Sequence, residues 1–257
     1  MKKVKNIFKL IILIAVSTFL DARSSSDYNW MIDTINNQKV LTQQILKEYA
    51  FFGMGNTFGD SKDSLKKYLV AYENDIAELA KVISDVKAHE YIKEVNEIWL
   101  PIKKIFNEKP EKSKVAQLQK QTDKILDRMS KLMKIVLSKS VEEKSVIVSI
   151  SGYETVIIER MGALYMLKTW GIDDPKFKFK MRESINFFKN SLYKMLNSKE
   201  TNPTNKARID KVMKEFKFFE IMNRSKTKFV PTLIYDKTDK IHKILTQITQ
   251  EYIKEDK

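Results

Sequence analysis

The chain has 257 residues, 43% of them apolar, which is enough to form a sizeable buried core. It holds only 6 Gly and 5 Pro, clustered at a few points, so an all-β fold with frequent turns is excluded. The formal net charge is +14, but the lysines are scattered among Glu and Asp instead of forming one stripe with aromatics, so no nucleic-acid partner is expected.

The first 26 residues are typical of a signal peptide. Positive charges precede an apolar run over 10–20, and small residues follow it; the charges are Lys2, Lys3, Lys5 and Lys9. A run this short does not comfortably span the roughly 30 Å core of a bilayer. We therefore expect export to the periplasm, with an uncleaved membrane anchor as the alternative. The chain has no Cys, so neither a disulfide nor a lipid-modified cysteine is expected.

The first half of the chain predicts helices over about 28–52, 61–86 and 89–106, with a fourth from 113. Apolar residues at three-and-four spacing, such as Ile35, Leu41 and Ile45, define the buried face of the first helix. Three glycines in 53–59 end it, and Asp60 or Ser61 is expected to cap the next. Pro101 is expected to kink or split the third helix.

The second half predicts a similar series of helices. Residues 113–170 contain no Pro, and the first Gly among them is Gly152. This favours one long shared helix that joins the two halves, and the polar patch 138–145 is the expected place of any interruption. Gly171 then ends a helix, and further helices are expected up to about 197 and over about 207–223 and 231–253.

The two halves are related by a shift of 116 residues. Leu41 then falls on Ile157, Gln43 on Glu159 and Tyr49 on Tyr165, and the segment Thr-Asp-Lys-Ile occurs at both 122–125 and 238–241. Separate blocks with one offset indicate an internal repeat. The predicted fold is therefore all-α, with two tandem antiparallel four-helix bundle modules over 27–140 and 141–257. They could stack end to end through the shared helix, or pack their first helices side by side.

Chemistry that needs a catalytic residue or a metal is not expected. The chain has two His and no Cys, and neither His belongs to a zinc or di-iron motif. Nucleotide-binding and serine-hydrolase motifs are missing. Asp239 and His242 are interpreted as surface or packing residues. We therefore expect neither an enzyme, a metal site nor a cofactor.

The polar residues of the two first helices are the candidate binding site. Polar side chains at a bundle seam cost stability unless they pair or bind a ligand. The alternative is that they form the solvent face of an amphipathic helix. The candidate ligand-binding residues are Gln38, Lys39, Gln43, Tyr153, Thr155, Glu159 and Arg160.

These helices resemble the signature helix of the PilJ-type domain, the N-terminal sensor domain of type IV pili methyl-accepting chemotaxis transducers, which is similar to the periplasmic domains of nitrate/nitrite sensors. The matching residues are Gly152, Glu159-Arg160-Met161, Gly162-Ala163 and Tyr165, and in the first half Leu41-Thr42-Gln43 and Tyr49. The family's anion-reading arginine is replaced by Lys39 in one copy and Thr155 in the other. Lys39 supplies a point charge without the two-pronged geometry of arginine.

The resemblance implies a periplasmic sensory protein. It would bind a small anionic or polar ligand on the signature helices and act through a membrane-bound receptor or kinase. A homodimer is an open arrangement. The alternative function is that of a structural or interaction protein of the envelope, in which the ligand site is degenerate and empty.

Overall fold

The computed structural model describes residues 24–55, 60–140, 142–224 and 230–254, and all regular structure in these ranges is helical. The all-α prediction is confirmed. The predicted signal peptide lies outside the described residues except for its last three positions. The helices of the described chain are α2 (Ser25–Gly53), α3 (Ser61–Val82), α4 (Val86–Asn107), α5 (Lys112–Lys139), α6 (Glu143–Thr169), α7 (Phe177–Leu196), α8 (Pro203–Arg224) and α9 (Pro231–Lys254).

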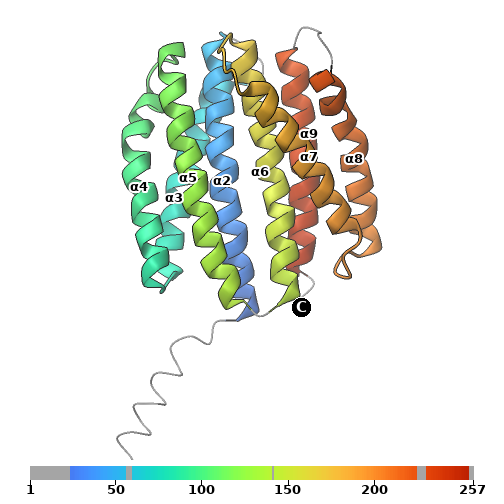
Figure 1. Cartoon of the computed structure of the whole chain (residues 1–257). Helices are drawn as coiled ribbons and strands as arrows, with labels where there is room; N and C mark the ends of the chain where they lie inside the picture. The colour runs from blue at the N-terminus through green and yellow to red at the C-terminus, as the bar shows by residue number, and fades with distance from the viewer. Residues whose placement is uncertain (1–23, 56–59, 141, 225–229, 255–257) are drawn as a thin grey trace, which may run out of the picture.

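The helix bounds repeat with the same 116-residue offset as the sequence. Moving α3 by 116 gives 177–198, against 177–196 for α7, and moving α4 gives 202–223, against 203–224 for α8. Neighbouring helices run antiparallel within each set of four (Figure 1). The duplicated sequence therefore folds into two four-helix bundles with the same plan.

The predicted long shared helix does not form. α5 ends at Lys139 and α6 begins at Glu143, and the flanking residues Ser140 and Glu142 both have extended backbone. The Ser140 hydroxyl donates to the Ser145 hydroxyl at 2.6 Å, across the break. The break falls in the polar patch named above. It lets the chain reverse direction, which is the only way α6 can lie beside α2.

The two bundles pack side by side through their first helices, which is the second of the two arrangements left open by the sequence. α2 and α6 lie at the centre and contact each other; α3 and α5 pack on α2, and α7 and α9 pack on α6 (Figure 1). α4 packs on α3 and α5, and α8 packs on α7 and α9, so these two helices lie farthest from the central pair. Both central helices run in the same direction. Each is covered by neighbours on several sides, so a polar residue on either one is drawn into the interior.

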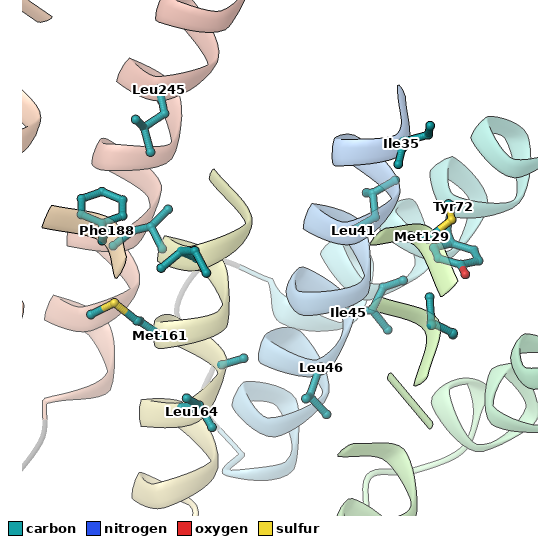
Figure 2. Close-up of a cluster of buried hydrophobic side chains, with 14 of the residues drawn as sticks. Ile35, Leu41, Ile45, Leu46, Tyr72, Met129, Met161, Leu164, Phe188 and Leu245 are labelled. Carbon is teal, nitrogen blue, oxygen red and sulfur yellow. The ribbon is translucent and has the colours of Figure 1, made fainter. Parts of the chain in front are cut away.

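The core continues through both bundles and takes in side chains of all the described helices. Equivalent positions carry equivalent core residues on either side of the central pair. Figure 2 shows three such pairs, all fully buried: Ile45 and Met161, Tyr72 and Phe188, and Met129 and Leu245. The side chains change between the copies while the positions remain apolar. Burial of this layer ties the bundles into one packed body.

The helix ends at Asp60 and Gly171 agree with the sequence prediction, whereas the possible split of the third helix at Pro101 does not occur. Asp60 caps α3 with its side chain accepting from the Asp63 backbone N–H, and Gly171 adopts a positive φ of 84° just after α6. Pro101 does not split the third helix, because α4 runs through it without interruption. Its side chain is exposed, so the ring displaces no packed neighbour.

Candidate functional site

The polar runs of α2 and α6 meet along the line where the two helices touch. The Ser145 hydroxyl donates to the Asn29 side chain at 2.9 Å, and these two residues occupy the same position in the two copies of the repeat. The Asn36 amide donates to the Ser149 carbonyl at 3.1 Å. A Cβ on Gly152 would lie 2.4 Å from the Asn36 amide nitrogen. The glycine shared with the signature helix therefore permits the close approach of α2 and α6.

A buried ion pair crosses the same seam. Lys47 Nζ lies 2.7 Å from one Glu159 oxygen, and His242 Nδ1 lies 2.8 Å from the other, where the Gln44 amide also donates at 3.4 Å. Burial is the largest influence on Glu159 and opposes its ionisation. The Lys47 charge and the hydrogen bonds from His242 and Lys47 together outweigh burial, and hold the Glu159 pKa at about 2. Glu159 is therefore a structural anion that joins α2, α6 and α9.

The seven candidate residues do not form a single site, because they lie on two sides of the α2/α6 pair. The α3/α9 side holds Gln38, Thr155 and Glu159, and the α5/α7 side holds Lys39, Gln43, Tyr153 and Arg160. Gln38 donates to the Tyr72 carbonyl at 2.8 Å, and Glu159 is held by its ion pair. Glu159 is therefore occupied by the protein itself, and so is the amide nitrogen of Gln38, whose Oε1 is buried without a hydrogen-bond partner among the described residues.

The α5/α7 side carries a pocket of about 220 Å³, which we call the basic groove. Its charged lining residues are Lys39 of α2 and Lys134 of α5, and Tyr153 and Phe187 form an aromatic wall. Lys39 is only 3% exposed, and its Nζ lies 5.1 Å from the centre of the Tyr153 ring. It has no carboxylate partner among the described residues. Burial lowers the Lys39 pKa to about 8.

The basic groove is adjacent to a wider pocket of about 470 Å³ that contains Arg160. The two pockets share Tyr153 and Phe187, whose rings are edge to face with centres 5.2 Å apart. The Arg160 guanidinium lies 3.5 Å from the Asp123 carboxylate. Gln43 lies with Arg160 in a narrow crevice beside it. Of the two predicted anion-binding cations, Arg160 therefore has a carboxylate partner, whereas Lys39 has none in the part of the chain that the structure describes.

The α3/α9 side carries a larger pocket of about 570 Å³, which we call the acidic cavity. Its charged side chains are Asp33 of α2 and Asp75 and Glu78 of α3, and Thr155 is the candidate residue that lines it. His242 lies at its edge, in contact with Glu159.

The basic groove and the acidic cavity occupy equivalent places in the two copies. The 116-residue shift turns lining positions of one into lining positions of the other: Asp33 into Ser149, Asn37 into Tyr153, Lys39 into Thr155 and Lys134 into Gln250. Duplication therefore built the same pocket twice, on opposite sides of the central pair. The two pockets differ in the sign of their charge.

Sequence reasoning missed the residues that other helices bring to these pockets. Lys134, Asp75 and Gln250 lie on α5, α3 and α9, and nothing in the pattern of those helices distinguishes them from surface residues. His242 contacts Glu159, whereas Asp239 pairs with Lys243 at 2.7 Å. The internal repeat could have identified them. Once a residue is known to line the pocket of Lys39, the residue 116 positions away becomes a candidate for the equivalent pocket on the opposite side of the central helices.

Replacing Lys39 by methionine should stabilise the empty protein. The ammonium is buried without a partner, so Lys39→Met should raise the free energy of unfolding by about 1–3 kcal/mol at pH 7. The folded pKa of about 8 lies below the unfolded value of 10.5, so the parent gains stability as pH rises between them. Urea unfolding at pH 7, 9 and 10 measures both effects. Parallel pH curves for parent and variant would contradict this.

No family model, no curated protein and no solved structure matches this chain. The resemblance to PilJ-type sensor domains therefore stays a prediction that comes from the residues quoted above.

Proposed function

We propose that the protein is a sensory ligand-binding protein that takes a small anion in the basic groove. The observation that carries this proposal is Lys39, a cation on the central helix pair that is almost fully buried and that has no carboxylate partner among the residues described. Burying an unpaired charge is costly, and a bound anion would restore the missing partner. The proposal keeps the chemistry suggested by the resemblance but places it in one of the two equivalent pockets.

The groove favours an anion with an apolar part. Lys39 and Lys134 supply positive charge from two helices, while Tyr153, Phe187 and Met133 present ring and thioether surfaces. A lysine ammonium is a compact donor with three N–H groups and does not impose the planar two-pronged geometry of arginine. A small carboxylate whose body packs on the aromatic wall fits this lining better than nitrate does.

Signalling through a partner is part of the same proposal. None of the described helices is both long and apolar enough to cross a membrane. A ligand in the groove would touch α2, α5, α6 and α7 together, and so both bundles at once. Binding that changes how α2 and α6 pack would be readable by a membrane-bound receptor or kinase in the periplasm, which is the partner class that the resemblance implies.

A thermal-shift screen of the full chain tests the proposed function. The panel is acetate, benzoate, acidic amino acids, nitrate and nitrite at pH 7. A ligand at 100 times its Kd should stabilise the protein by about 2.7 kcal/mol, an upward shift of a few degrees in Tm. Lys39→Met should abolish the shift, and binding should weaken above about pH 8 as Lys39 loses its proton.

The matched control is Lys131→Met, which removes a half-buried lysine from the same helix as Lys134, paired with Asp127 and outside the groove, and should leave the shift unchanged. A ligand shift that survives in Lys39→Met would show that the anion binds elsewhere. If no anion in the panel shifts the parent, the second function, an envelope interaction protein with an empty site, becomes the better account.

A further inference from the structure

We infer that the acidic cavity is a second binding site, and that it takes a small organic amine through Asp33 and Asp75. This goes beyond the proposed anion site, because the cavity lies on the opposite side of α2 and α6 and its lining carries the opposite charge.

The first reason is the charge of the cavity in a chain that is otherwise strongly basic. The sequence has 47 Lys and Arg against 33 Asp and Glu, yet none of the described Lys or Arg residues lines this pocket, while Asp33, Asp75 and Glu78 do. Glu78 is paired with Lys81 at 2.7 Å, but Asp33 and Asp75 have no cationic partner among the described residues. A cationic ligand would supply the charge that these two carboxylates lack.

The second reason is the state of the two carboxylates. Asp33 accepts from the Gln250 amide at 3.0 Å and Asp75 from the Asn37 amide at 2.5 Å, so both are held in place by neutral donors. Burial raises the pKa of each, and the Asp75 charge raises that of Asp33 further. Both carboxylates line the same cavity, and an ammonium group bound there would supply the positive charge that favours their ionised forms.

The third reason is an unused acceptor at the pocket wall. Asn36 lines both pockets and is only 2% exposed; its amide nitrogen donates to the carbonyl of Ser149, which lines the basic groove, while its Oδ1 is buried and has no hydrogen-bond partner among the described residues. Buried polar atoms of this kind are uncommon and point to a missing partner. An ammonium group has three donors and no acceptor, which matches a wall made of carboxylate and amide oxygens.

The size of the cavity and its rim select an organic cation. A volume of about 570 Å³ is in the range of small-molecule sites and far exceeds the needs of one ion. No three His, Asp or Glu side chains in the described part of the chain are grouped so as to hold a metal. Trp30 lines the pocket and is 41% exposed, and its indole face can attract a cation.

Isothermal titration calorimetry of the full chain at low salt tests the inference with two probes of matched size. The probes are 1,4-diaminobutane, which carries two positive charges, and 1,4-butanediol, which carries none. We expect saturable binding of the diamine and none of the diol. Asp33→Asn and Asp75→Asn should each weaken diamine binding at least tenfold, whereas Asp173→Asn, which removes an exposed carboxylate, should not change it.

Several results would overturn the inference. One is equal binding of diol and diamine, and another is unchanged diamine affinity in both cavity variants. A third is displacement of the diamine by millimolar Mg²⁺ or Ca²⁺, with the binding of the metal ion also weakened by Asp33→Asn, because this would indicate a metal site. Circular dichroism and Tm establish that each variant is folded, and two separate variants guard against a folding defect in one.

A reciprocal comparison separates this inference from the proposed function. Lys39→Met should leave diamine binding unchanged, and Asp33→Asn should leave anion binding unchanged. Loss of both ligands in either variant would show that the two pockets do not act as separate sites.

Discussion

Glu159→Ala should lower the free energy of unfolding by about 3–5 kcal/mol, the largest effect that we expect of any polar substitution in the chain. The mutation removes the carboxylate that forms the salt bridge with Lys47, a residue only 2% exposed, and it removes the acceptor of His242. Losing one partner of a buried ion pair costs more than the pair contributes, because the remaining charge stays desolvated. Urea unfolding at pH 7, followed by circular dichroism, measures the change.

The fall of the free energy of unfolding at acid pH gives a second measure of the stability that Glu159 contributes. Its folded pKa of about 2 lies below the ordinary value of 4.5, so its contribution is complete above pH 4.5 and is lost as pH falls toward 2. Glu159→Ala should reduce that fall relative to the parent. The control is the double variant Lys47→Met with Glu159→Leu, which removes both charges and should be far more stable than Glu159→Ala. A loss below about 1 kcal/mol in the single variant would contradict the buried-pair account.

Trp99→Ala should destabilise the chain by about 3–5 kcal/mol, although none of the described residues of its helix, α4, lines either pocket. Trp99 is 2% exposed and stacks on Tyr72 with ring centres 3.9 Å apart. The second copy has the same arrangement, in which Phe188 stacks on Phe216 at 4.3 Å. Truncating Trp99 opens a large cavity in the first bundle and removes this ring contact.

This variant also tests whether the two bundles unfold together. Because the core continues through α2 and α6, both Trp99→Ala and Phe216→Ala should shift one common unfolding transition. Leu100→Ala removes a neighbouring side chain that is 61% exposed and should cost less than about 0.5 kcal/mol. Two separate transitions in Trp99→Ala, one of them at the midpoint of the parent, would show that the bundles fold independently.

The sequence by itself determined the helices and their duplication. Helix class, caps and ends depend on local residues: three-and-four apolar spacing, Asp60 before α3, and the glycines at 53–59 and 171. The 116-residue repeat is visible when the two halves of the sequence are aligned, and the bounds of the helices repeat with nearly the same offset. Lys39 was also singled out as a candidate in this way, because its place in the polar run of the first helix is a local feature.

Only the tertiary structure decided how the copies pack and where the pockets lie. Helical periodicity says that a face is apolar but not which helix covers it, so a break at 140–142 and a continuous helix were both compatible with the polar patch. Packing α6 beside α2 divided the seven candidates between two sides. It also brought Lys47 to Glu159, and Asp75 to the pocket of Asp33, over separations of 112 and 42 residues. Such contacts depend on the free energy gained when two particular helix faces are buried against each other, and the local sequence of either helix does not predict which faces will meet.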